Sequence, residues 1–413
     1  MKRRREDTAF ALLRLPDDLL LQCVSLAVEE YSQVQKISRT CRVLQQLVLN
    51  TPGLFGHIRL SLPLKYAKKV TAVYRFWPYV SADTTDALCL FRAGLKTISL
   101  PRNVSISALA ELSQAPLLRE LRMQECDLSL LVTALPWFGQ LQKLCLSTHN
   151  IDAALAAVIP TSLTDLSARH ISCAQDLPVL RDLEYLRLGS YCDKPAILST
   201  QCPNLLSFFI QCHEPEEQLM DFSSFHNLLE LELGVHGCYQ VPSTLEFLTT
   251  FHSNELIGPV PAALRCLTMN STTRFSADIA QVDKLCSVPS LEYLCATDIK
   301  PSTLVRLAAL PKFNELRLHC EDRKTVINLL PFPWLQAFSI QNCVDPQFFP
   351  QLSTLQSLTD LTINDCSVQH DVVRHLLQTL TKLKVLNLWN CDTVKACRLR
   401  KEFPNVFIDT ILE

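Results

Sequence analysis

The sequence has few of the residues and motifs that mark catalytic and nucleotide-binding sites. Its 413 residues include only eight glycines, and neither G-x-G-x-x-G nor G-x-x-x-x-G-K-[ST] occurs, so no loop is recognisable as a phosphate cradle. The G-x-S-x-G and H-E-x-x-H motifs are absent as well. Because scattered His and Asp residues cannot be assembled into a catalytic set, we expect a non-enzymatic protein without a cofactor.

The chain also lacks an excess of charge of either sign. Lys and Arg number 39 against 41 Asp and Glu, a formal net charge of −2, so no basic field suggests nucleic acid as the main partner. No apolar run reaches the roughly 18 residues of a membrane helix, so no membrane partner is expected. The basic segment 2–7 lacks the apolar region of a secretory signal. It is interpreted as a solvated tail or a short nuclear-import signal, which places the protein in the cytoplasm or the nucleus.

Cysteine is abundant, with 18 residues, but its spacing excludes the commonest metal sites. No two cysteines form the C-x-x-C pairs of zinc sites, so no metal is expected. Without a secretory signal, most of these cysteines are expected to be reduced thiols.

One pattern dominates the chain, and its clearest copy, L-x-x-L-x-[LI]-x-x-C, covers residues 358–366. The frame begins at Leu95, Leu118, Leu141, Leu163, Leu183, Leu205, Leu228, Leu264, Leu291, Phe313, Leu335, Leu358 and Leu383. Most starts are about 20 to 27 residues apart, and a weaker copy begins at Leu245. Each copy predicts a short strand with one apolar face, which it can bury only against a neighbour built in the same way.

This period resembles that of leucine-rich repeats. The resemblance implies an α/β solenoid, a horseshoe with parallel strands on its concave side. Segments 105–113 and 371–380 have helical spacing, 331–334 is too proline-rich for a helix, and 236–262 is the least regular part. In this family the last position of the pattern holds Asn or Cys, pointing inward beneath the turn. That position is occupied here by Cys126, Cys343, Cys366 and Cys391.

A different pattern precedes the repeats. Leu15-Pro16-Asp17-Asp18-Leu19-Leu20 has a proline suited to the first turn of a helix and acidic residues favoured by the helix dipole. A second helical stretch over 34–44 contains Ile37-Ser38 and Cys41-Arg42. Together they resemble the F-box over roughly 12–56, with Asp18, Thr40 and Leu44 in place of the usual Glu, Val and aromatic. The resemblance implies that this all-helical module binds a Skp-type adaptor through Leu15, Pro16, Leu19, Leu20, Cys23, Val24, Ile37, Ser38, Cys41 and Leu44.

The expected organisation is therefore a basic tail (1–9), an F-box-like module (10–56), a connector that packs on the first repeat (57–94) and a repeat solenoid (95–413). By resemblance, the protein would be the substrate-recognition subunit of a Skp–cullin–F-box ubiquitin ligase, binding a cullin–RING ligase through the adaptor. One alternative is a repeat scaffold or inhibitor whose N-terminal helices only cap the array. Another is a ligase with its own cysteine nucleophile, which would need a catalytic domain for which little chain remains after Cys391. The same architecture occurs in eukaryotic proteins and in bacterial effectors that act in the host cytosol.

The unknown protein target is expected on the concave face. In each strand the residues between the aliphatic positions face that side. Aromatic and arginine residues dominate interface energetics. The residues of this kind on the expected face are Arg122, Tyr185, Arg187, Phe209, Tyr293, Arg317 and Trp389.

Overall fold

The computed structural model divides into two compact units, Met1–Leu188 (unit 1) and Gly189–Glu413 (unit 2). It describes residues 60–62, 79–82, 95–100, 104–123, 127–190, 195–211, 219–234, 237–251, 254–269, 284, 288–297, 299, 301–320, 332–391 and 394–411. The expected tail (1–9) and F-box-like module (10–56) lie outside these residues.

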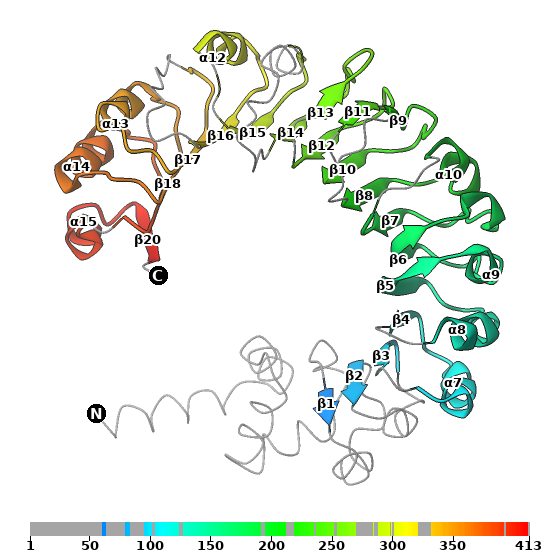
Figure 1. Ribbon diagram of the computed structural model, residues 1–413. Helices are drawn as coiled ribbons and strands as arrows, with labels where there is room; N and C mark the ends of the chain where they lie inside the picture. Colours follow the sequence, from blue (N-terminus) through cyan, green and yellow to red (C-terminus); the bar gives the residue numbers. More distant parts are fainter. Residues whose placement is uncertain are drawn as a thin grey trace, which may run out of the picture. The chain divides into compact units, whose positions relative to one another are not determined.

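Unit 1 is built on a ladder of parallel strands (Figure 1). These are β1 (Leu60–Leu62), β2 (Tyr79–Ala82), β3 (Thr97–Leu100), β4 (Glu120–Met123), β5 (Lys143–Ile151), β6 (Asp165–Ile171) and β7 (Tyr185–Leu188). Each strand pairs in parallel with the next. From β3 onward every strand begins two residues after a frame start, while β1 and β2 extend the ladder into the 57–94 range.

Short helices connect the strands of unit 1. They are α7 (Ile106–Ser113), α8 (Leu128–Ala134), α9 (Ala153–Ala156) and the 3₁₀ helices η2 (Leu135–Trp137) and η3 (Ala174–Asp176). The three α-helices begin after a capping side chain, with Ser105, Asp127 and Asp152 each accepting a bond from a first-turn N–H. The helix expected over 105–113 is therefore present as α7.

Unit 2 continues the same design in a second parallel ladder. Its strands are β8 (Ser207–Gln211), β10 (Glu230–Gly234), β12 (Phe247–Thr250), β14 (Cys266–Met269), β15 (Tyr293–Thr297), β16 (Glu315–His319), β17 (Ala337–Gln341), β18 (Asp360–Asn364), β19 (Val385–Trp389) and β20 (Phe407–Ile411). They pair in that order. The weak frame at Leu245 forms β12, so it is a full repeat of the ladder.

The stretch that looked least regular, 236–262, contributes to a small second sheet. Its strands β9 (Leu219–Asp221), β11 (Gly237–Gln240) and β13 (Asn254–Leu256) pair in parallel, in the order β9–β11–β13. Tyr239 of β11 is fully buried, and Phe222, just after β9, packs edge-on against Phe208 of β8 with ring centroids 5.7 Å apart. Strands replace helices in these connectors, so the helical spacing is missing from their sequence.

Helices connect most of the other described strands of unit 2. They are α10 (Pro195–Gln201), α12 (Pro301–Ala308), α13 (Phe348–Gln351), η4 (Leu352–Thr354), α14 (His370–Thr379) and α15 (Ala396–Glu402). Figure 1 shows α12 to α15 on one side of the strands β15 to β20. The helix expected over 371–380 is α14, which buries Val373, Leu376 and Leu377 toward the strands.

The core consists of the repeated aliphatic positions. Leu358, Leu361 and Ile363 are all fully buried, and most other described frames bury their residues in the same way, an exception being the half-buried Met269 of β14. Fully burying one such side chain stabilises the fold by about 1.5–3 kcal/mol. The sequence frame therefore corresponds to a continuous apolar layer between strands and connectors.

A turn in three successive repeats, 342–343, 365–366 and 390–391, explains the cysteine position. Asn342, Asp365 and Asn390 have φ of 60°, 50° and 51°, a left-handed conformation that Asn and Asp tolerate better than other side chains. This turn places the next residue, a cysteine, beneath the chain. There Cys366 Sγ lies 3.0 Å from the carbonyl oxygen of Asn364, to which it donates, and 3.3 Å from the backbone N–H of Cys343, from which it accepts.

Burial raises the pKa of the Cys366 thiol to about 12, so it stays protonated and able to donate. Cys343 and Cys391 are buried at the same position. The expectation of inward thiols that bond backbone groups is confirmed for Cys366 and Cys391, whereas Cys126 lies outside the described residues.

Candidate binding surface

The candidate surface is the side of each ladder that carries the residues between the buried aliphatic positions, here called the strand face. The ladder register aligns these residues in columns. In unit 1 the middle column runs Ser99, Arg122, Cys145, Ser167 and Arg187. In unit 2 it runs Phe209, Glu232, Thr249, Thr268, Cys295, Arg317, Ser339, Thr362, Asn387 and Asp409.

Paired charges dominate the strand face of unit 1. Glu120 forms an ion pair with Arg122 and accepts a hydrogen bond from Thr97, at 3.0 Å. The hydrogen bond to Glu120 raises the pKa of Arg122. On β5 and β6, Lys143 Nζ lies 3.5 Å from Asp165 Oδ2. Since these charges offset one another, this part of the face favours no ligand of a single sign.

Tyr185 and Arg187 lie on β7, the last strand of the unit 1 ladder. The register pairs Tyr185 with Asp165 and Arg187 with Ser167. The Tyr185 side chain is 49% exposed, and Arg187 is exposed as well. An exposed aromatic beside an exposed arginine is a common composition for a protein-binding patch.

A cluster on the unit 2 face joins Tyr293, Glu315 and Arg317. Arg317 Nη2 lies 2.8 Å from Glu315 Oε1, and the same guanidinium lies 5.4 Å from the centroid of the Tyr293 ring. A guanidinium at this distance is attracted to the ring face. The ion pair and the ring together hold a long side chain that would otherwise lose rotamer entropy on binding.

Burial disfavours the charged forms of two neighbours of Arg317, Tyr293 and Cys295. It raises the pKa of the half-buried Tyr293 to about 12 and also raises that of the Cys295 thiol. Neither group is therefore ionised near neutral pH, and Cys295 is a poor nucleophile because the thiol, not the thiolate, predominates. This cluster suits binding rather than covalent chemistry.

The remaining predicted residues are spread along the unit 2 ladder. Phe209 is half-buried on β8, several strands from Tyr293. Trp389 is half-buried at the end of β19, beside Asn364 of β18. In the middle column, no residue between Arg317 of β16 and Asp409 of β20 is charged. The side-chain amide of Asn387 in this column donates to Thr362 Oγ1 at 3.1 Å. Of the predicted target-binding set in unit 2, only Tyr293 and Arg317 contact each other directly.

Two exposed aromatics on the strand face are missing from the sequence prediction. Phe247 of β12 is 39% exposed, and Phe407 of β20 is 66% exposed. Both stand in the column that contains Tyr293. The frame at Leu245 would reveal Phe247 as part of a full repeat, and a further strand over residues 407–411 would reveal Phe407.

All ten predicted adaptor-binding residues, from Leu15 to Leu44, lie outside the described residues. Within the part of the chain that the structure describes, no three His, Cys, Asp or Glu residues gather as a metal would need. No helix among these residues combines the length and apolar character required to cross a membrane.

Comparisons with known proteins assign no family to the chain. No family model and no curated protein matches the chain. Among solved structures, a leucine-rich-repeat protein of Leptospira interrogans matches 84% of this chain and 99% of its own, at 16% identity and a TM-score of 0.39. An internalin from Listeria monocytogenes matches 73% of this chain and 82% of its own, at 19% identity and a TM-score of 0.36. Likeness of this degree places no ligand or partner on this chain, so its function is inferred from its own residues.

Proposed function

We propose that the chain is a non-catalytic substrate receptor that holds a target protein on its strand face and presents it to a cullin–RING ubiquitin ligase. The observation that carries the target-holding role is the cluster of Tyr293, Glu315 and Arg317. It offers an aromatic and an arginine already held in place, the residue types that contribute most to protein interfaces. Preorganisation reduces the entropy lost on association.

The link to the ligase depends on the F-box resemblance of residues 12–56. There, Leu15, Pro16 and Leu19 would dock in an apolar groove of the Skp-type adaptor, in the manner of helices that fill such grooves. The chain itself would do no chemistry, and it would act in the cytosol or the nucleus. The alternative, a repeat scaffold or inhibitor without a ubiquitin role, uses the same strand face but assigns no adaptor to residues 12–56.

Two variants of the full chain separate the two halves of the proposal. Pro16→Ala with Leu19→Ala should abolish co-purification with recombinant Skp adaptor while leaving proteins captured by the repeats unchanged. Arg317→Glu should do the opposite, lowering target capture about 30-fold or more, as expected for the loss of an interface hot spot worth about 2 kcal/mol.

Arg398→Glu provides the matched control for Arg317→Glu. Arg398 is exposed on α15, so its reversal makes the same charge change away from the strand face. Wild-type chain that fails to bind the adaptor would eliminate the ligase role and favour the scaffold. Equal target capture by the Arg317→Glu and Arg398→Glu variants would show that the target does not bind the strand face at Arg317.

A further inference from the structure

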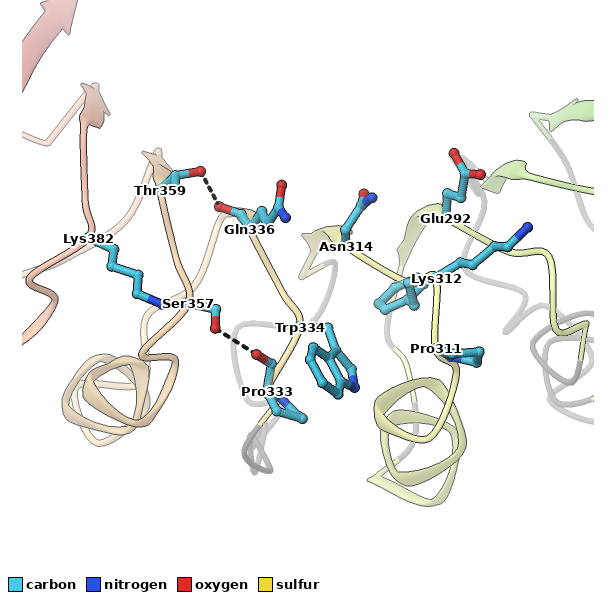
Figure 2. Close-up of a pocket in the computed structure, with 11 residues that line it drawn as sticks. Glu292, Pro311, Lys312, Asn314, Pro333, Trp334, Gln336, Ser357, Thr359 and Lys382 are labelled. Atoms are coloured by element: carbon cyan, nitrogen blue, oxygen red, sulfur yellow. Dashed lines mark hydrogen bonds between the residues drawn. The ribbon is translucent and has the colours of Figure 1, made fainter.

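A second recessed surface lies in unit 2, where the chain enters strands β16 to β19 (Figure 2). It is an open groove of about 630 Å³, within the range of peptide and small-ligand sites. The turns that precede the strands line it, and they include Pro311, Lys312, Trp334, Ser357 and Lys382. These five residues lie outside the strand-face columns, while Glu292 and Asn314 of the same lining directly precede Tyr293 and Glu315, so the groove adjoins the strand face at one edge.

Hydrogen bonds between neighbouring turns make the floor of the groove a fixed structure. Ser357 Oγ donates to the carbonyl oxygen of Pro333 at 2.6 Å, and the Thr359 hydroxyl lies between two acceptors, Asp360 Oδ2 at 2.6 Å and the carbonyl oxygen of Gln336 at 3.0 Å (Figure 2). The backbone N–H of Gln336 in turn donates to the carbonyl oxygen of Asn314 at 2.8 Å. A ligand would therefore meet a preformed surface rather than one that it must order.

Trp334 is the apolar feature of this surface. Its side chain is 60% exposed, and Figure 2 shows the indole between the turn that carries Pro333 and the turn that carries Pro311. Burying a tryptophan removes more apolar area from water than burying almost any other side chain. Grooves lined by aromatic side chains also bind extended, proline-containing peptides.

The charge of the groove is positive. Lys312 and Lys382 line it from the turns before β16 and β19. The lining carboxylate, Glu292, is bound by Arg265, with Nη2 to Oε2 at 2.9 Å and Nε to Oε1 at 3.1 Å. This bond, with a smaller contribution from Lys312, lowers the pKa of Glu292. Arg265 also pairs with Glu246, Nη1 to Oε2 at 3.5 Å, so it offsets the charge of Glu292 only in part. With two lysines against one lining carboxylate, the groove still carries an excess of positive charge.

The spacing of these features limits what could bind. From β16 to β19 there are three inter-strand steps of roughly 4.8 Å, which place the two lysine-bearing turns about 14 Å apart. An extended chain covers that distance in about four residues at roughly 3.3 Å each. Trp334 precedes β17, so it lies closer to Lys312 than to Lys382 in the ladder.

We propose that this groove docks an extended, acidic peptide segment of a partner protein. Two carboxylates about four residues apart would bind Lys312 and Lys382, and a proline or large apolar side chain next to one of them would cover Trp334. The amides of Asn314 and Gln336, which also line the groove, can bond the backbone of the segment. The protein thus carries a second docking surface with its own chemistry, independent of the strand face.

A peptide array tests this assignment on the full chain. The probes are hexapeptides with two glutamates placed one to five residues apart and proline, leucine or serine beside the first glutamate. We expect the strongest binding at a separation of three or four residues with proline or leucine. Trp334→Ala and Lys312→Glu with Lys382→Glu should each weaken that binding at least tenfold, whereas Lys401→Glu on α15 and Arg317→Glu should leave it unchanged.

The same array carries the outcomes that overturn the proposal. Absence of binding to the wild-type chain, or undiminished binding to Trp334→Ala, would refute it. Equal binding of the serine probes would refute the apolar anchor, and loss of binding in Arg317→Glu would refute independence from the strand face. The substituted side chains are exposed, so thermal melts of every variant should match the wild-type melt. Probes with lysine in place of glutamate should bind the Lys312→Glu, Lys382→Glu variant, because the charges of both partners are then exchanged.

Discussion

The guanidinium of Arg317 lies 5.4 Å from the ring centroid of Tyr293, across the boundary between strands β15 and β16. Because Glu315 holds the other side of that guanidinium, the arginine is fixed from two directions. In this contact the Tyr293 ring is half-buried, and burial disfavours its phenolate. The ionisation of Tyr293 therefore reports on the burial of this cluster.

The first prediction concerns the pH dependence of Tyr293. Its pKa of about 12 in the folded chain exceeds the ordinary value of 10.0 because burial disfavours the phenolate. A raised pKa stabilises the fold below pH 10, and this contribution is lost as the pH rises from 10 to 12. Phenolate absorbance should show Tyr293 ionising near pH 12, apart from the fully buried Tyr239, whose pKa burial also raises, and Tyr293→Phe should remove the step near pH 12. Ionisation of Tyr293 at its ordinary pKa would contradict the burial of its ring.

The second prediction concerns the buried cysteine turn. Cys366→Ala removes the acceptor of the Cys343 N–H and leaves that donor buried without it. An unsatisfied buried group costs about 1–3 kcal/mol, so the free energy of unfolding should fall by that amount in urea titrations. Cys397→Ala is the control, because Cys397 is exposed and its loss should change stability by less than about 0.5 kcal/mol. Equal effects of the two substitutions would argue against the thiol bond.

The third prediction uses the left-handed turn before Cys391. Asn390 has a φ of 51°, which a β-branched residue adopts only at a cost of about 1–3 kcal/mol. Asn390→Val should destabilise the chain by about that much. Asn390→Gly relieves the backbone but gives up the 2.9 Å bond from Asn390 to Asp365, so its effect should be small. A valine variant as stable as the glycine variant in thermal melts would show that the turn is not left-handed.

The fourth prediction separates the substrate receptor from the capped scaffold. If residues 1–56 form an adaptor-binding module, their deletion should shift the Tm of the remaining chain by no more than about 5 °C, since each repeat packs only on its neighbours. If they form a cap, the deletion exposes the first apolar face and the array should lose its cooperative transition. Circular dichroism melts of residues 57–413 distinguish the two outcomes.

Much of the fold could be predicted because the repeat pattern is local. Within β18, Leu361 and Ile363 alternate with polar residues, and side chains of a strand point to opposite faces in turn. Their burial and the start of β18 follow directly. The small sheet of β9, β11 and β13 could not be predicted in this way, because short strands of irregular spacing carry no period.

The sequence by itself determined which side chains stand on the strand face, since that depends only on alternation within each frame. The tertiary structure alone decided which of them meet. Tyr293 and Arg317 are brought together by the register between two strands, and Trp334 shares a groove with Lys312 and Lys382 because turns from different repeats lie side by side. Contacts of this kind join residues distant in the chain, and no local pattern specifies them.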